Sequence, residues 1–184
     1  KLWNISRYII TTSEEKYFTA PTSSWPEAKT VADDWILQKL DGTIKQVDAS
    51  LANYEFSAAV EALNDFTWNQ LADWYLEIAK IEKDKEEILA FVLKTILKLW
   101  HPFIPFVTEV IWQSLNTGKL LLVETWPTIY LSPYQSRFPQ ADLALIQEVV
   151  IAIRNARAEN QVEPAKKIQA IIYAPQQEKF LQDH

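Results

Sequence analysis

Apolar residues recur every three or four positions along most of the chain, and this spacing predicts helices rather than strands. Residues 86–100 carry two neighbouring apolar stripes, a pattern typical of a helix in the interior of a bundle. A polar stretch punctuated by prolines, residues 13–26, is expected to be a loop. The pattern as a whole predicts helices over residues 1–11, 31–47, 56–80, 86–100 and 141–160.

Two prolines interrupt the apolar run that follows residue 100. Pro102 is expected to end the preceding helix near His101, because proline in a helix interior removes a backbone hydrogen bond. Pro105 suits the first turn of a new helix that runs toward Leu115. The sequence therefore predicts a tight corner between two core helices. We expect His101 to be a structural hydrogen-bonding residue there rather than a catalytic base.

The last part of the chain departs from the helical period. Residues 119–123 are expected to form a short extended crossing segment, and residues 166–173 (KKIQAIIY) a strand without an evident partner. Residues 176–184 are expected to begin another helix. The predicted fold class is all-α, with a helical bundle over residues 1–160 and the start of a small, truncated α/β element over residues 161–184.

Composition narrows the possible classes of protein. The chain has 184 residues, 48% of them hydrophobic, which suffices for one sizeable core. It has no cysteine, so disulfides and thiolate metal sites are excluded, and its two histidines give no metal-ligand spacing. No apolar run approaches the roughly 18 residues of a membrane span. We therefore expect a cytoplasmic protein with no membrane partner and no metal site. Because methionine is absent, we also expect the chain to be a piece of a longer protein.

The net charge of −6 argues mildly against a nucleic-acid partner, but the charge is unevenly distributed. Residues 150–168 carry four basic side chains against two acidic ones, and the basic residues are Arg154, Arg157, Lys166 and Lys167. Nucleic-acid-binding proteins depend on such local excesses more than on their total charge. This segment is therefore the first candidate for a binding surface.

The residues suggest recognition rather than catalysis. No nucleophile with its base, no glycine-rich phosphate loop and no metal-ligand spacing occurs in the sequence, so we predict no catalytic residue in this chain. Arg157 continues the apolar stripe of Ile153, where an apolar residue is expected. It either covers the helix end and reaches toward water, or presents a guanidinium that binds phosphate or stacks on a base. Asn155 lies beside it, between Arg154 and Arg157.

Two further candidates lie near the start of the chain. Arg7 and Asn4 form a similar pair, one helical turn apart, on the first predicted helix. Trp25 lies in the predicted loop, where an aromatic face can stack on an unpaired base. The alternative for Trp25 is simple packing against the following helix.

Several segments resemble the anticodon-binding part of class I valyl-tRNA synthetases, and they occur in the order of that family. Residues 1–8 (KLWNISRY) resemble the family segment KLWNASRF, and residues 73–77 (DWYLE) resemble DWYIE. Residues 122–127 (LVETWP) resemble part of LMVEPWP. The stretch WHPFIPFVTEVIWQ over residues 100–113 is also similar to isoleucyl and leucyl relatives, whereas residues 152–159 (AIRNARAE) are similar to the valyl AIRNLRAE.

This resemblance implies a helical bundle that binds the anticodon arm of valine tRNA. The whole enzyme would be a valine-tRNA ligase that uses ATP with Mg²⁺, and its catalytic and editing domains would be further partners in the same chain. Motifs resembling HIGH and KMSKS are absent from this sequence, so the chain is expected to bind tRNA without catalysing. It would do so through Asn4, Arg7, Trp25, Arg154, Asn155, Arg157, Lys166 and Lys167. The alternatives are a helical protein–protein scaffold and the equivalent domain of an isoleucyl or leucyl relative.

The sequence departs from the family pattern at three places. The basic residue of the family segment DRWI is here Asp34, which puts a phosphate contact near that position in doubt. Ala72 replaces the cysteine that usually precedes DWYIE. The loop PPGKK is here EPAKK, residues 163–167, so the family glycine and its conformational freedom are missing.

Overall fold

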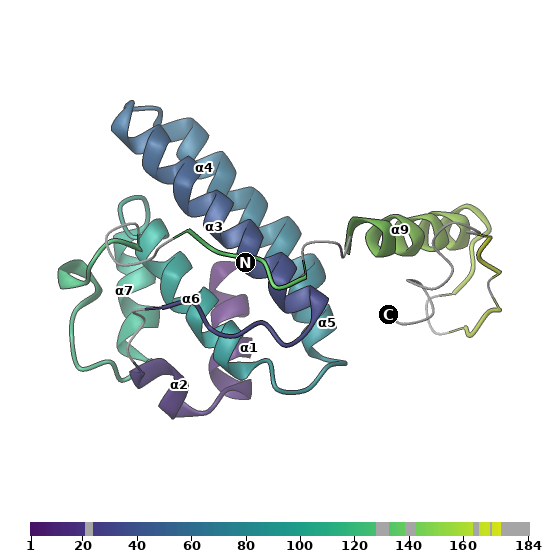
Figure 1. Ribbon diagram of the computed structural model, residues 1–184, viewed down its shortest axis with the longest axis horizontal. Coiled ribbons are helices and arrows are strands. Elements are labelled where there is room, and N and C mark those ends of the chain that lie inside the picture. Colours follow the sequence, from purple (N-terminus) through teal and green to yellow (C-terminus); the bar gives the residue numbers. More distant parts are fainter. Residues whose placement is uncertain (21–23, 128–132, 139–142, 164–165, 170, 174–184) are drawn as a thin grey trace. The chain divides into compact units, whose positions relative to one another are not determined.

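The computed structural model describes residues 1–20, 24–127, 133–138, 143–163, 166–169 and 171–173 (Figure 1). All regular elements in these residues are helical, so the all-α prediction is confirmed for the described part of the chain. Contacts divide the chain into two compact units, Lys1–Pro139 and Gln140–His184, and each is described by itself below. The predicted boundary between bundle and α/β element, at residue 160, stays a prediction.

The first unit begins with α1 (Leu2–Thr12), as the apolar spacing predicts. Its buried side chains, Leu2, Ile5, Ser6 and Ile9, lie on one face of the helix. The short helix α2 (Glu15–Thr19) follows, so the prediction of an uninterrupted loop over residues 13–26 is wrong. Phe18 anchors α2 in the core, and this one buried aromatic side chain is too weak a periodic signal to reveal a five-residue helix.

Helix α3 (Val31–Ala52) is longer than the predicted span of 31–47. A capping box fixes its start: the Thr30 hydroxyl accepts from the Asp33 backbone N–H, and the Asp33 carboxylate accepts from the Thr30 N–H. Helix α4 (Phe56–Asn64) returns alongside α3, so the two helices form an antiparallel pair (Figure 1).

The single helix predicted over residues 56–80 has three differently wound parts. After α4 comes the π-helix η1 (Asp65–Tyr75), followed by the short α-helix α5 (Leu76–Ala79). In η1, Phe66 and Leu71 are five residues apart and both are fully buried. A π-helix bonds residue i to i+5, so it brings these two positions onto one face. Periodicity predicts the helix but does not distinguish this winding.

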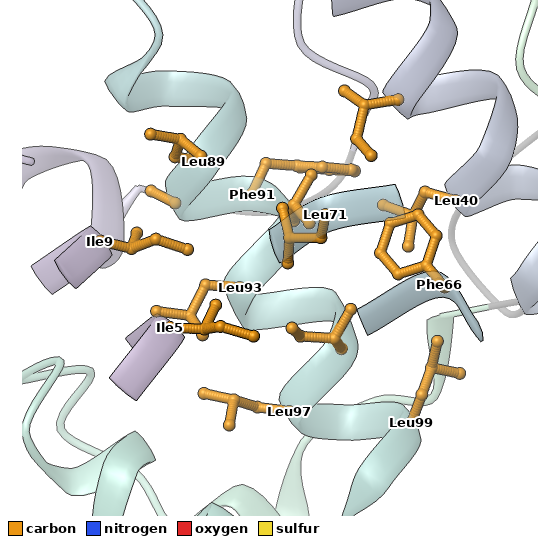
Figure 2. Packing of buried hydrophobic residues seen from close by; sticks show 14 of the residues in the cluster. Ile5, Ile9, Leu40, Phe66, Leu71, Leu89, Phe91, Leu93, Leu97 and Leu99 are labelled. Atoms are coloured by element: carbon orange, nitrogen blue, oxygen red, sulfur yellow. The ribbon is translucent and has the colours of Figure 1, made fainter. Parts of the chain in front are cut away.

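Helix α6 (Glu86–Trp100) is the centre of the first unit and has the predicted bounds. Every side chain from Ile88 to Trp100 is buried, which confirms the prediction of an interior helix. Figure 2 shows part of its core, where Leu93 of α6 lies beside Ile5 of α1. Ile9 of α1, Leu40 of α3 and Phe66 of η1 belong to the same buried cluster.

The proline corner is confirmed. Helix α6 ends at Trp100, and α7 (Pro105–Gln113) begins with Pro105 in its first turn. The imidazole Nδ1 of His101 lies 2.9 Å from the Thr108 hydroxyl, so His101 makes the predicted structural hydrogen bond between the end of α6 and α7.

Two predicted extended segments differ in the structure. Residues 121–123 form the 3-10 helix η2 (Leu121–Val123), although Leu120 and Glu124 on either side are extended. In the second unit, α9 (Leu143–Glu159) lies within the predicted helix of 141–160. Residues 166–169 and 171–173 are neither helix nor strand, so the predicted strand is not formed in them. A lone strand has no ladder partner, which is why its propensity alone does not suffice. The helix predicted over 176–184 lies outside the described residues.

Candidate nucleic-acid interface

The outer face of α1 presents the first pair of predicted site residues. Because Leu2, Ile5, Ser6 and Ile9 point into the core, Asn4 and Arg7 are left exposed on the same side of the helix. The Arg7 guanidinium has no hydrogen bond and no carboxylate partner among the described residues. It is therefore a cation available to a ligand.

A groove lies between this face of α1 and helix α7. Its volume is about 220 Å³, and it brings Arg7 together with side chains from a helix almost one hundred residues further along the chain. Trp3 also lines it, with 52% of its surface exposed. The full lining comprises Trp3, Ser6, Arg7, Ile10, Thr11, Ile111 and Ser114.

Trp25 is in a different environment. Its ring centroid lies 5.3 Å from that of Phe91 and 5.2 Å from that of Tyr134, so most of its stacking capacity is used within the protein. The remainder of the ring lines a second groove, of about 500 Å³, beside Tyr134 and Arg137. The packing alternative for Trp25 thus has a structural basis, and this groove has no lining residue in common with the groove at Arg7.

Asp34, the departure from the family pattern, holds the segment 133–138 against the start of α3. Its carboxylate accepts hydrogen bonds from the Tyr134 hydroxyl at 2.8 Å, the Ser136 hydroxyl at 2.7 Å and the Arg137 backbone N–H at 2.7 Å. Burial raises the pKa of Asp34, but these bonds, with one from Gln38, outweigh it and leave the pKa below its ordinary value. A carboxylate so occupied serves the fold, which agrees with the doubt about a phosphate contact here.

The neighbouring Asp33 is the centre of a buried polar cluster. Its carboxylate accepts from the Lys85 ammonium at 2.7 Å and from the Tyr75 hydroxyl at 2.8 Å. Burial and the Asp33 charge both raise the pKa of Tyr75, so this phenol stays protonated and acts as a donor. The cluster joins α3, η1 and the start of α6. It is a structural feature and adds no exposed polar group to the candidate interface.

The second unit contains the other predicted site residues. Arg154 and Asn155 are exposed on α9, and Lys166 and Lys167 are exposed after it. Arg157 is partly buried, and its Nη2 donates to the backbone oxygens of Glu163 at 2.7 Å and Lys166 at 3.1 Å. Arg157 therefore ties the chain after α9 back to the helix. This supports the helix-end alternative, while a role toward a ligand stays a prediction.

Two further kinds of site are not found in the described residues. Within them, no group of three or more histidine or acidic side chains is placed to hold a metal ion. No helix in the same part of the chain is long and apolar enough to cross a membrane.

The chain is similar to a known family of proteins. Residues 33–172 match the family described as the anticodon-binding domain of tRNA ligase, so the chain belongs to that family.

Among individual relatives, the chain is similar to valine–tRNA ligases. It is 37% identical to that of Bacillus cereus over 185 residues, which are 95% of this chain and 20% of the relative. It is 38% identical to that of Carboxydothermus hydrogenoformans, over 94% of this chain and 20% of the relative. The chain thus spans about one fifth of the length of the relatives it matches.

A solved structure has a similar fold. It is a LeuRS of Agrobacterium radiobacter K84 in a ternary complex with tRNA and LeuAMS. The TM-score is 0.55 and the sequence identity 19%, over 91% of this chain and 23% of that one. At this identity the likeness concerns the fold alone.

Sequence reasoning missed Trp3 and the side chains that α7 contributes to the groove. A signal for Trp3 exists in the helical phase: with Leu2, Ile5 and Ile9 facing the core, position 3 lies away from it. Ile111 and Ser114 have no such signal, because their approach to α1 depends on long-range packing.

Proposed function

We propose that this chain is the anticodon-arm recognition domain of a valine-tRNA ligase and that it binds valine tRNA without catalysing a reaction. The observation that supports this most is the 37% identity to valine–tRNA ligases over 95% of the chain. The whole protein would attach valine to its tRNA with ATP and Mg²⁺, in the cytoplasm. The adenylate-forming motifs are not in this sequence, so ATP use would belong to the catalytic domain of the same polypeptide. That catalytic domain and a separate editing domain would be partners of this one.

The contacts we propose fall into two sets, one in each unit. Arg7 and Asn4 on α1 form the first set. The second comprises Arg154, Asn155, Arg157, Lys166 and Lys167. Basic side chains contact phosphates and provide affinity, while unpaired bases in a loop are open to hydrogen bonding and stacking. Trp25 is a weaker candidate, because its ring already packs on Phe91 and Tyr134.

Binding of the 184-residue chain to valine tRNA and isoleucine tRNA at two salt concentrations tests the proposal. We expect a preference for valine tRNA and a loss of affinity with salt, because phosphate contacts release counterions. Arg154→Gln should reduce the slope of log K against log salt by about 1. The matched control is Lys45→Gln on α3, whose exposed ammonium is paired with Asp41 at 2.5 Å and should leave the slope unchanged.

Equal binding to both tRNAs would contradict the valine assignment and leave a generic tRNA-binding domain. Absence of binding to either tRNA at low salt would contradict the proposal itself and favour a protein–protein scaffold.

A further inference from the structure

The groove between α1 and α7 has the features of a binding site for a small planar group. Trp3 of α1 is 52% exposed, although the side chain is large and apolar, and no ring contact of Trp3 occurs among the described residues. Ile10 and Ile111 add apolar surface from the two helices. An exposed aromatic ring beside such a groove is able to stack on a flat ligand.

The hydroxyl groups in the groove do not make it strongly polar. Ser6 donates to the Leu2 carbonyl at 2.9 Å, Thr11 to the Arg7 carbonyl at 2.9 Å, and Ser114 to the Ile111 carbonyl at 2.6 Å. Each hydroxyl proton is therefore used within its own helix, and the hydroxyl oxygens remain only as acceptors. The groove consequently favours an aromatic group that carries a few N–H donors.

The volume of about 220 Å³ limits the size of the ligand. Sites for drug-sized molecules usually span about 300–1,000 Å³, so this groove suits a single ring system. Arg7 lines the same groove with no carboxylate partner among the described residues, and Asn4 lies one turn before it. A cation next to an apolar ring site complements a ligand that combines a planar base with an adjoining phosphate.

We propose that the groove between α1 and α7 binds one unpaired RNA base, which stacks on Trp3 while Arg7 contacts its neighbouring phosphate. This inference rests on the proposed function and assigns to Trp3 the stacking role that the sequence pattern suggested for Trp25. An apolar groove alone would also suit a protein partner. The unpaired Arg7 favours the anionic ligand, because docking an apolar protein surface would desolvate this charge without compensation.

Fluorescence of a base analogue provides the direct test. RNA hairpins with the anticodon-arm sequence of valine tRNA would carry 2-aminopurine at one loop position at a time and be titrated with the 184-residue chain. Stacking on an indole ring quenches 2-aminopurine, so we expect quenching at one loop position. Trp3→Ala should abolish that quenching and weaken binding about ten- to a hundredfold, the range of stacking on an aromatic side chain. Trp3→Phe should restore part of both.

Substitutions at two further positions separate the parts of the site. Arg7→Gln should lower the salt slope by about 1 while Arg7→Lys keeps it, because the slope counts neutralised phosphates. Ser114→Phe should occupy the groove from the α7 side and reduce quenching with Trp3 still present. The matched control is Phe56→Ala at the start of α4, an aromatic side chain with 55% exposure that should alter neither quenching nor affinity.

The outcomes distinguish this inference from the proposed function. Unchanged quenching and affinity in both Trp3→Ala and Ser114→Phe, in a chain that still binds the hairpin, would overturn the base site alone and leave the groove to a protein partner. Failure of the unmodified chain to bind any hairpin at low salt would overturn the proposed function and this site with it. Circular dichroism of Trp3→Ala should match that of the unmodified chain, because the side chain is half exposed.

Discussion

Helices α6 and α9 have similar lengths but very different surroundings. All residues of α6 from Ile88 to Trp100 are buried, whereas Leu143 is the one buried residue recorded for α9. The free energy of folding in the described residues is therefore concentrated around α6, because burial of apolar surface is its dominant favourable contribution. Helix α9 instead presents its polar and basic side chains to solvent, which suits a ligand-binding role.

The cations of the two helices show the same difference. Lys94 of α6 is buried and donates to the Ala20 carbonyl at 2.6 Å, and Lys98 pairs with Glu124 at 2.9 Å. Lys94 thus connects α6 to the segment after α2, and Lys98 connects it to the segment after η2. Arg154 of α9 lies at the surface. Basic residues in this protein consequently have two roles, and burial rather than residue type distinguishes them.

The largest effect is expected at the buried ion pair where α6 begins. Asp33→Ala removes the carboxylate partner of Lys85, whose side chain is only 3% exposed, and of the Tyr75 hydroxyl. The Lys85 ammonium keeps the partly exposed Glu82 at 2.5 Å but loses its buried partner, and the capping box of α3 is lost with it. The free energy of unfolding should therefore fall by about 3 kcal/mol, as measured by urea unfolding.

The matched control lies on the same helix, α3. Asp41→Ala breaks the more exposed pair with Lys45, four residues further on, and should cost no more than about 0.5 kcal/mol. Equal losses in Asp33→Ala and Asp41→Ala would contradict a structural role for the buried cluster.

A pair of truncations compares the two helices directly. Leu93→Ala in α6 removes a fully buried side chain and should destabilise the protein by about 2–5 kcal/mol, because it leaves a cavity in the core. Ile151→Ala in α9 removes a side chain with 45% exposure and should cost about 0.5 kcal/mol or less. Tryptophan fluorescence during urea unfolding measures both. A larger loss at Ile151 would show that α9 contributes to the stability of the fold.

The sequence predicts α6 and α9 equally well as helices, because both have apolar residues at helical spacing. It also distinguishes their burial in part. Two adjacent apolar stripes in α6 predict an interior helix, while Arg157 in the stripe of α9 indicates that burial ends there. The capping box at Thr30 and the proline at Pro105 are local signals, so the starts of α3 and α7 follow from sequence as well.

Features that depend on long-range contacts are not predictable in the same way. Three of the four donors to Asp34 are Tyr134, Ser136 and Arg137, about one hundred positions away, and no local pattern indicates their approach. The environment of Trp25 is equally unpredictable from the sequence, because its ring contacts Tyr134, which belongs to the same distant segment. The candidate basic residues can be identified from the sequence. The packing of the helices determines which aromatic side chain stays exposed beside them.

A smaller effect with a distinct pH dependence is expected at Lys94 of α6. Burial lowers its pKa to about 8, with a further contribution from the charge of Lys98. Between about pH 8 and pH 10.5 the unfolded chain then holds a proton that the folded chain has released, so stability rises with pH in this window. After allowance for screening by solvent, the rise should be about 1–2 kcal/mol.

Lys94→Met tests this sign. The variant should lack the rise in the free energy of unfolding between neutral and alkaline pH, measured by urea unfolding against pH. The control Lys29→Met alters an exposed lysine and should retain the rise, because Lys94 is intact. A rise of the same size in Lys94→Met would show that another group is responsible.

The smallest effect is expected on tRNA binding, at Arg157 of α9, where the two conservative changes Arg157→Lys and Arg154→Lys can be compared. Both keep the positive charge, but lysine lacks the planar guanidinium with which Arg157 bonds the carbonyls of Glu163 and Lys166.

Arg157→Lys should weaken binding of valine tRNA by about 0.5–1.5 kcal/mol, because the segment that carries Lys166 and Lys167 loses its hydrogen bonds to α9. Hydrogen exchange should be faster at residues 160–163, 166 and 167, with the bundle unchanged. Arg154→Lys should do neither, since the bonds to the carbonyls of Glu163 and Lys166 come from Arg157. Equal behaviour of the two variants would mean that Arg157 contributes only its charge, and that α9 recognises its ligand without an ordered segment after it.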